Sequence, residues 1–324
     1  MDLMKVLEAK AKARCCRVVY PEAADPKIVE AARITLTRGI AKPVLLGSAE
    51  NIASSGIDLT GMEIINPKTS AKVQRYAEAY AKSESFPVSS ITKMLVEPLN
   101  YGAMMVRMGD ADAMVAGLTH TTEEVILASE MLVGMLDGVS TPSSFFIMQV
   151  PNWDGGEEGL IVFADCAVVT NPSAQELAEV AITTASSVKG LLGWEPRVAM
   201  LSFSTKGSGT HPDVDKVVEA VRIARQQEPR LLVDGEMQGD SALVPSVAAK
   251  KIKGESKVGG RANILIFPDL DAGNISYKLV QRLAKAAAYG PVLQGFAKPV
   301  SDLSRGASVD DIVGVTIIVG ARAK

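Results

Sequence analysis

Short apolar runs alternate with helical patterns along most of this sequence, and that alternation limits the folds open to it. Residues 18–20 form an apolar run, residues 28–37 carry apolar side chains at helical spacing, and residues 43–46 form the next apolar run. Strand, helix and strand in close succession are typical of a parallel sheet with crossover helices. The sequence therefore predicts an α/β fold.

The same alternation continues to the end of the chain. One exception is the pair of apolar runs 145–148 and 160–164, which flank the loop 151–159 as a β-hairpin does. We expect further strands over 113–117, 198–203, 231–233, 264–268 and 292–295. We expect helices over 71–81, 101–107, 174–189, 275–288 and from Asp310 onward.

Size and composition exclude several classes of protein. A length of 324 residues predicts two domains, and 47% hydrophobic with 22% charged residues is typical of a globular protein. The net charge of -3 argues against nucleic acid as a partner. No uncharged apolar run approaches the ~20 residues of a membrane span. We therefore expect a soluble, cytoplasmic protein.

The three cysteines and two histidines do not form a recognisable ligand set. Cys15 and Cys16 are adjacent and Cys166 is distant, so a disulfide framework is not expected. Neither His120 nor His211 has a cysteine or histidine nearby at metal-ligand spacing. The sequence therefore predicts no metal site, and Cys166 reads as a small core residue.

The stretch 301–311 gathers a hydroxyl, a guanidinium and several carboxylates around Gly306. Arg305 offers a planar fork of donors that suits a phosphate. Ser308 followed by two acids before an apolar run is typical of a helix start. The residues alone therefore leave two interpretations open, an anion-binding loop or an ordinary loop before a capped surface helix.

Two other loops have the composition of anion sites. Residues 117–122 place glycine and hydroxyls between a strand and a helix, which suits either anion binding or N-capping by Thr121 or Thr122. Residues 204–210 combine hydroxyls, Lys206 and two glycines, whose backbone N–H groups could surround a phosphate. The second loop lacks the Walker spacing, so an ordinary loop is its alternative interpretation.

The order of several phrases resembles the phosphate acetyltransferase (phosphotransacetylase) family, in its short form without a regulatory N-terminal part. The resemblance runs almost from end to end of the chain. It is densest at VFADC (162–166), RVAMLSFSTKGS (197–208), DGEMQ (234–238), ANILIFPDLDAGNISYK (262–278), QRL (281–283), residues 290–295 and PVSDLSRG (299–306).

This resemblance implies a reversible acetyl transfer between coenzyme A and inorganic phosphate, with coenzyme A as a substrate and no metal or other cofactor. It also implies an isocitrate-dehydrogenase-like fold of two α/β domains with mostly parallel sheets and the active site in the cleft between them. The first domain is then discontinuous, 1–142 with 293–324, and the second is 143–292. A homodimer is expected.

The family motif also implies roles for individual residues. Asp311 matches the general base that takes the proton of the thiol. Arg305 matches the arginine that binds the phosphoryl group and stabilises the forming oxyanion, and Ser304 matches the serine that positions the thiol or the transition state. The expected substrate-binding residues are His120, Thr121, Ser143, Thr205, Lys206, Ser208, Asn274, Arg282, Tyr289 and Gly290.

Two positions depart from the family pattern. Leu127 and Glu84 stand where family members usually carry arginines that bind the coenzyme A or phosphate anions. Arg75, Lys82, Lys93 and Arg107 are alternative sources of charge. Two other functions therefore stay open, a phosphate acyltransferase for a longer chain such as butyryl, and a non-catalytic domain that senses acetyl-coenzyme A or acetyl phosphate.

The apolar residues around Phe145 and Phe146, and those over 275–283, allow two interpretations. They form either part of an interface between subunits or part of the core of one chain.

Overall fold

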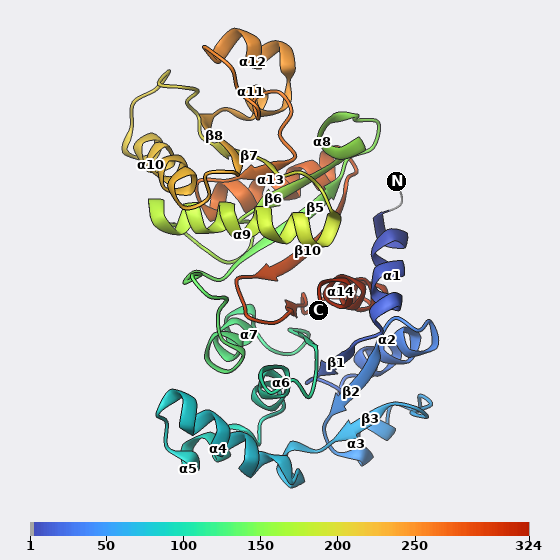
Figure 1. The fold of residues 1–324 in the computed structure, drawn as a ribbon. Helices are drawn as coiled ribbons and strands as arrows, with labels where there is room; N and C mark the ends of the chain where they lie inside the picture. Colours follow the sequence, from blue (N-terminus) through green and yellow to red (C-terminus); the bar gives the residue numbers. More distant parts are fainter. Residues whose placement is uncertain (1–2, 324) are drawn as a thin grey trace. The chain divides into compact units, whose positions relative to one another are not determined.

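The computed structural model describes residues 3–323 (Figure 1). Contacts divide the chain into two compact units. The continuous unit is 138–295, and the discontinuous unit is made of the described residues before and after it. The domain bounds expected from the sequence, 143–292 and 1–142 with 293–324, differ from these by a few residues at each junction. A cleft shared by the two domains stays a prediction.

The discontinuous unit is built on a parallel sheet with the strand order β11-β4-β1-β2-β3. Each pair of neighbouring strands in it is parallel. Its strands are β1 (Arg17–Tyr20), β2 (Lys42–Leu46), β3 (Glu63–Ile65), β4 (Ala113–Ala116) and β11 (Val300–Asp302).

Helices cover both faces of this sheet, as a parallel sheet requires. Tyr20 points to one face, where its hydroxyl forms a hydrogen bond with the hydroxyl of Thr316 in α14 (Val309–Arg322). Val19 and its register partner Met114 point to the other face, where Gly102 of α6 lies against Met114. The helices are α1 (Leu3–Arg14), α2 (Pro26–Thr37), α3 (Ala49–Ala53), η1 (Pro67–Thr69), α4 (Lys72–Glu84), α5 (Val88–Met94), α6 (Pro98–Arg107), α7 (Thr122–Ala128), η2 (Ser129–Val133) and α14 (Val309–Arg322).

The continuous unit is built on a mixed sheet with the strand order β10-β5-β6-β9-β7-β8. β5 and β6 pair antiparallel, which confirms the predicted hairpin, and β10 pairs antiparallel with β5. The other pairs are parallel. The strands are β5 (Ser143–Gln149), β6 (Leu160–Ala164), β7 (Arg197–Leu201), β8 (Leu232–Met237), β9 (Ile264–Ile266) and β10 (Ala287–Gln294).

The core of the continuous unit includes Phe146, Phe163 and Cys166, which are buried on one face of the sheet. There Tyr277 of α13 stacks on Phe146, with 4.2 Å between the ring centroids. The buried Cys166 confirms its interpretation as a core residue. The helices are α8 (Gly155–Glu158), α9 (Ala174–Leu192), α10 (Pro212–Gln227), α11 (Gly239–Leu243), α12 (Pro245–Lys251) and α13 (Leu270–Leu283).

Two sequence predictions about secondary structure are wrong near the C-terminus. The helix predicted over 275–288 is α13, which begins at Leu270 and ends at Leu283, and residues 287–294 form β10. Pairing with β5 decides this, because Ala288 and Tyr289 lie opposite Met148 and Ile147. The start of the 301–311 stretch, predicted as loop, belongs to the strand β11.

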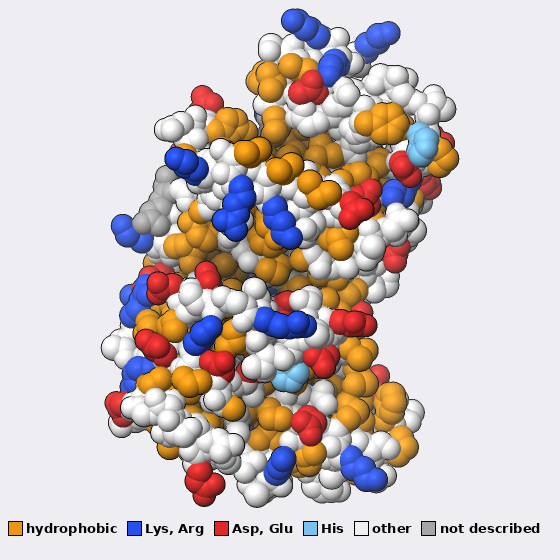
Figure 2. Space-filling model, turned by 180° about the vertical axis from the view of Figure 1, so that it is seen from behind, with side chains coloured by type: hydrophobic (Ala, Val, Ile, Leu, Met, Phe, Trp, Pro, Cys, Tyr) orange, Lys and Arg blue, Asp and Glu red, His pale blue; other side chains and the backbone are white. Residues whose placement is uncertain are grey.

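Figure 2 shows basic and acidic side chains interspersed over one face of the molecule, and that face has no broad basic area among its described residues. Within residues 3–323, every helix is too short or too polar to cross a membrane. A location in the cytoplasm stays a prediction.

Candidate active site

The loops that follow β1, β4 and β11 meet at one edge of the parallel sheet in the discontinuous unit. The three strands are neighbours, and parallel strands end at the same edge. Ala116 and Asp302 lie opposite each other at the ends of β4 and β11, and the backbone N–H of Leu303 donates to the Ala116 carbonyl at 2.7 Å. This edge brings together the discontinuous unit's share of the predicted site residues.

Ser304 and Arg305 are exposed in the loop after β11. The Ser304 hydroxyl accepts a hydrogen bond from the Gly306 N–H at 3.3 Å, which closes a tight turn. Within the described part of the chain, the Arg305 guanidinium makes no hydrogen bond or ion pair. An exposed guanidinium without a partner is available to an anion from solvent.

Asp311 belongs to a capping box at the start of α14, as the sequence predicts for a helix start. Its carboxylate accepts hydrogen bonds from the backbone N–H of Ser308 at 2.9 Å and from the Ser308 hydroxyl at 2.7 Å. Both bonds reach Oδ2, and the side chain is exposed. Asp311 therefore has a structural role in this arrangement, and its Oδ1 stays open to a ligand.

The backbone N–H groups of Leu118, Thr119 and His120 do not form an open anion site. The N–H groups of Leu118, Thr119 and His120 all donate to the buried carboxylate of Glu22, at 2.8 to 2.9 Å. Thr121 caps α7 by accepting the N–H of Glu124 at 3.1 Å. The N-capping interpretation is therefore confirmed, whereas the three backbone donors are not available to an anion in this arrangement because Glu22 accepts them.

Glu22 and His120 form a hydrogen-bonded pair at this edge. The His120 Nδ1 atom lies 2.8 Å from the Glu22 Oε1 atom. Burial raises the pKa of Glu22, but the hydrogen bonds from the His120 side chain and from the N–H groups of Thr119 and His120 outweigh it and lower the pKa to about 2. Glu22 is therefore ionised over the whole physiological range.

Asp302 is a second buried carboxylate of the edge, with 3% of the residue exposed. Its Oδ2 accepts a hydrogen bond from the Thr122 hydroxyl at 2.5 Å, and its Oδ1 has no partner among the described residues. Burial raises its pKa to about 6, against the opposing effect of the Thr122 hydrogen bond. Asp302 connects the start of α7 to the end of β11.

Gly117 makes the close approach of these two loops possible. A Cβ at Gly117 would lie 2.0 Å from the Asp302 Oδ1 atom and 2.5 Å from the Leu303 N–H nitrogen. Gly117→Ala is therefore expected to destabilise the fold by about 3 kcal/mol, through overpacking and through a φ of +109°. Gly109→Ala is the control, since Gly109 also has a positive φ but open space around it. Thermal unfolding of both variants tests this, and equal losses would contradict the packing argument.

The predicted phosphate site of the loop 204–210, in the continuous unit, has its backbone donors occupied. The Gly207 N–H and the Ser204 hydroxyl both donate to Glu236 at 2.8 Å. The Thr205 N–H donates to the Ser208 hydroxyl at 2.9 Å, and the Gly209 N–H donates to Ser204 at 3.0 Å. In this arrangement these N–H groups are not free to surround a phosphate, and contact of Thr205, Lys206 and Ser208 with a substrate stays a prediction.

The charge of Lys206 is also used inside the continuous unit. Its Nζ atom lies 2.5 Å from an Asp234 carboxylate oxygen and 2.6 Å from the Gly235 carbonyl oxygen. Asp234 also accepts a hydrogen bond from Arg225 at 2.7 Å and one from Ser256 at 2.6 Å. Lys206 thus holds the loop onto β8, and these two contacts use two of the three N–H donors of its ammonium group.

The remaining predicted residues of the continuous unit lie at different places. Asn274 lies at the same sheet edge as the loop 204–210, where it donates to the Cys166 carbonyl at 2.9 Å. Ser143 is fully buried and accepts from Gln294, so its position does not support contact with a substrate. The Tyr289 hydroxyl donates to Gln149, at the opposite end of β6.

Gly290 and Arg282 do not join that edge either. Gly290 lies inside β10, where a Cβ would meet a ring carbon of Phe146 at 2.7 Å. Arg282 lies in the last turn of α13, and the first residues of that helix follow the carboxyl end of β9. A helix rises about 1.5 Å per residue, so Arg282 lies well away from Asn274. The sheet edge therefore gathers only Thr205, Lys206, Ser208 and Asn274.

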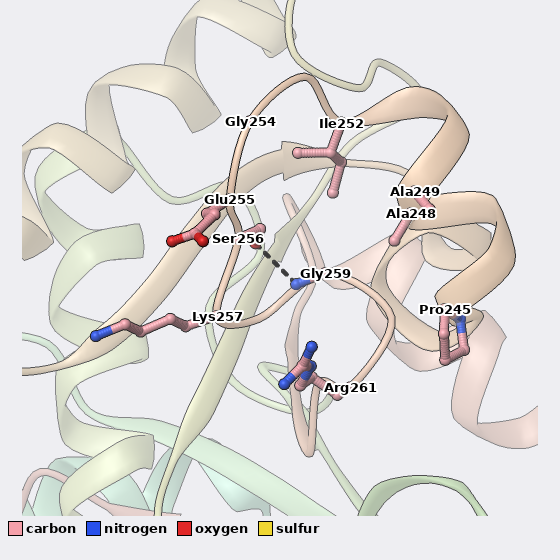
Figure 3. A pocket seen from close by; sticks show the side chains of 10 residues that line it. All are labelled: Pro245, Ala248, Ala249, Ile252, Gly254, Glu255, Ser256, Lys257, Gly259 and Arg261. Carbon is pink, nitrogen blue, oxygen red and sulfur yellow. Dashed lines mark hydrogen bonds between the residues drawn. The ribbon is translucent and has the colours of Figure 1, made fainter.

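A pocket of about 650 Å³ lies elsewhere in the continuous unit, beside α12 (Figure 3). Pro245, Ala248 and Ile252 form one side, and the loop with Lys257 and the side chain of Arg261 forms the other. Ser256, at its wall, donates to Asp234. None of the predicted site residues lines this pocket.

The two departures from the family pattern have distinct surroundings. Leu127 on α7 is 60% exposed, so an apolar side chain faces solvent at this position. Glu84 forms an ion pair with Arg107. Arg75 pairs with Asp110 at 2.8 Å, a carboxylate that Lys72 also contacts, so Arg75 and Arg107, two of the alternative cations, already take part in ion pairs.

Comparison with known proteins decides the family. The model of the phosphate acetyl/butaryl transferase family matches residues 2–320. The chain belongs to this family. A phosphate acetyltransferase from Thermoanaerobacterium thermosaccharolyticum is 47% identical over 329 residues, which cover 100% of both chains. Another, from Acetivibrio thermocellus, is 44% identical over 329 residues, covering 100% of this chain and 99% of the relative.

Solved structures of this phosphate acetyl/butaryl transferase family share the fold. A phosphotransacetylase from Streptococcus pyogenes superposes with a TM-score of 0.92 at 41% identity, covering 99% of this chain and 97% of that one. A phosphotransacetylase from Staphylococcus aureus gives a TM-score of 0.90 at 37% identity, covering 100% and 98%. The α/β fold with mostly parallel sheets is confirmed.

Three buried carboxylates beside predicted site residues were not identified from the sequence, namely Glu22 and Asp302 in the discontinuous unit and Glu236 in the continuous unit. Each lies at or just after the carboxyl end of a parallel strand. That position is a usable signal, because open α/β sheets keep their sites at this edge. The position of a carboxylate at a strand end does not show which backbone N–H groups will donate hydrogen bonds to it.

Proposed function

We propose that the chain catalyses acetyl transfer between coenzyme A and inorganic phosphate. The observation that carries the proposal is the exposed Arg305 beside Ser304, which has no partner among the described residues and lies at the carboxyl edge of a parallel sheet, four residues before the start of α14. Membership of the phosphate acetyl/butaryl transferase family gives this arrangement its chemistry. The relatives named phosphate acetyltransferase support the acetyl group as the one transferred.

The proposed mechanism is direct attack in a ternary complex. Asp311 takes the proton of the coenzyme A thiol, because a free thiol near pKa 8.5 is mostly protonated at neutral pH. The thiolate attacks the carbonyl carbon of acetyl phosphate, the carbon–oxygen bond to phosphate breaks, and inorganic phosphate leaves with the electron pair. Arg305 stabilises the negative charge on the phosphoryl group and the forming oxyanion, and Ser304 positions the thiol.

This mechanism uses no metal and no cofactor besides the two substrates, since the thiolate is generated by a carboxylate. Transfer activity is therefore expected to survive dialysis against a chelator. Full loss of activity that Mg²⁺ or Zn²⁺ restores would contradict this part of the proposal.

The acyl group is tested by a coupled assay in both directions with acetyl, propionyl and butyryl donors. We expect the highest kcat/KM with acetyl. A higher kcat/KM with butyryl would instead favour the longer-chain acyltransferase, which the family description also allows. Binding of acetyl-coenzyme A or acetyl phosphate without turnover would favour a sensing domain.

Leu127→Arg restores a charge that family members usually carry. We expect it to lower the KM for coenzyme A or phosphate more than it raises kcat, because binding of a distant anion stabilises ground state and transition state alike. Leu127→Gln, which is polar but uncharged, is the control. An unchanged KM for every substrate would show that charge at this position has no effect in this chain.

We also propose that two copies of the chain pair through α13. Ile275, Leu279 and Leu283 recur at every fourth position on that helix and are 56%, 52% and 80% exposed. Phe145 and Phe146 are buried within one chain, so they contribute core rather than interface. Light scattering at micromolar concentration is expected to give the mass of a dimer, and Leu279→Lys is expected to give the mass of one chain. A monomeric mass for the unmodified chain would overturn the proposal.

A further inference from the structure

The Glu22 carboxylate accepts more hydrogen bonds than are needed to hold one loop residue in place. Its side chain is 1% exposed. It accepts hydrogen bonds from three backbone N–H groups and from the Thr119 hydroxyl at 2.9 Å, and it lies 2.8 Å from the His120 ring nitrogen Nδ1. The backbone donors fix the carboxylate at the end of β4, so it cannot turn away from His120. A carboxylate fixed in this way also fixes the orientation of the ring that it binds.

His120 is left with one ring nitrogen for a ligand. Because Nδ1 faces Glu22, Nε2 lies on the other side of the ring, and the side chain is 31% exposed. No hydrogen bond to Nε2 occurs within residues 3–323. An imidazolium in this position donates through Nε2, whereas a neutral ring that donates from Nδ1 to Glu22 has only an acceptor there.

The charges around His120 favour the imidazolium. The hydrogen bond to Glu22 raises the pKa of His120, burial opposes it, and the carboxylates of Glu22, Glu124 on α7 and Glu97 at the start of α6 raise it further. Glu22 in turn faces Asp302, whose pKa it raises. The ring is therefore surrounded by negative charge that includes the fixed carboxylate.

His120 lies near Arg305, since their loops follow neighbouring strands. Ala116 and Asp302 are register partners at the strand ends, and the two cations come four and three residues later. The charges of His120 and Arg305 both act on Glu124. The pKa of Glu124 is lowered first by the hydrogen bond from the N–H of Thr121, and further by the charges of His120 and Arg305. A phosphate at Arg305 is thus within electrostatic reach of His120 as well.

We propose that Glu22 is a positioning residue that holds His120 as an imidazolium, so that Nε2–H binds the phosphate of the acyl phosphate together with Arg305. This proposal rests on the proposed function, because it names the phosphate ligand of the same site.

Histidine NMR tests the charge state directly, because the sequence has only two histidines, His120 and His211. In protein labelled with [13C-ε1]histidine, we expect His120 to titrate above the ordinary histidine pKa, and its pKa to rise further on addition of inorganic phosphate. Glu22→Gln is expected to lower the His120 pKa by about one unit or more. The His211 signal serves as the reference in the same tube. An ordinary pKa for His120, or a signal that phosphate does not move, overturns the proposal.

Steady-state kinetics tests the role in the reaction. His120→Asn is expected to raise the KM for acetyl phosphate about 10- to 100-fold with a smaller change in kcat, as lost charge-assisted binding predicts. In Glu22→Gln, the KM is expected to begin rising at lower pH than in the unmodified protein, which a purely structural role would not cause. His211→Asn, which keeps an N-cap acceptor on α10, is the control. An unchanged KM in His120→Asn overturns the proposal.

The two levels of the proposal fail in different ways. If the unmodified protein binds inorganic phosphate at His120 but transfers no acetyl group, the proposed function fails and the Glu22–His120 pair stands. If it transfers acetyl and phosphate leaves His120 unaffected, the pair fails and the proposed function stands. If Glu22→Gln does not fold, the phosphate titration of the unmodified protein decides alone.

Discussion

Asp311→Asn is expected to lower kcat about 10²- to 10⁴-fold, because it removes the group that takes the proton of the thiol. The melting temperature is expected to change little, since the asparagine side-chain oxygen can still accept the two Ser308 hydrogen bonds that Asp311 accepts now. Acetyl transfer measured from pH 6 to 9.5 tests this. At high pH the thiol ionises without help, so the loss is expected to shrink there.

Asp310→Asn is the matched control. Successive helical residues point about 100° apart, so only one of the two carboxylates can face a given substrate. Both are exposed and both lie in the first turn of α14, where the helix N-terminus stabilises a carboxylate whatever its function. If Asp311→Asn keeps the kcat of the unmodified protein at neutral pH, Asp311 is a capping residue and the base lies elsewhere.

Arg305→Gln is expected to lower kcat/KM for acetyl transfer about 10²- to 10³-fold, the usual effect of removing a donor that stabilises developing negative charge. The guanidinium has no partner within residues 3–323, so no loss of stability is expected. Arg305→Lys keeps the charge but not the planar fork, and it is expected to recover only part of the activity. A glutamine variant with normal kcat/KM would remove Arg305 from the mechanism.

The strands of the two sheets could be predicted wherever burial on both faces makes them continuously apolar, as at 113–116 and 264–266. The first half of β10 could not be predicted as a strand from the sequence. Residues 284–288 are rich in alanine, which favours a helix, and only the pairing of Ala287 and Ala288 with β5 makes these two residues the start of a strand. β11 is three residues long, too short for its alternation to be recognised.

The candidate site could be predicted where its residues lie together in sequence. Ser304, Arg305 and Asp311 fall within one loop and one helix start, so a motif locates them. Glu22 could not be predicted as the partner of His120, since the two are far apart in the chain and meet only because β1 and β4 are neighbours.

Composition alone also misled at the loop 204–210, whose small and hydroxyl residues suit a phosphate. There the Glu236 carboxylate, which comes from the next strand of the sheet, accepts the hydrogen bonds that a bound anion would accept. A sequence pattern shows which donors are present, whereas the packing of distant segments decides whether they are free.

Exchange of labelled phosphate tests the proposed reaction most directly. In direct transfer to coenzyme A, ³²P from inorganic phosphate enters acetyl phosphate only when coenzyme A is present, since the enzyme itself never carries the acetyl group. We expect no exchange with acetyl phosphate and labelled phosphate alone, and rapid exchange once coenzyme A is added. Exchange without coenzyme A would show an acyl-enzyme intermediate, and no exchange in either case would show that the chain does not transfer acetyl groups.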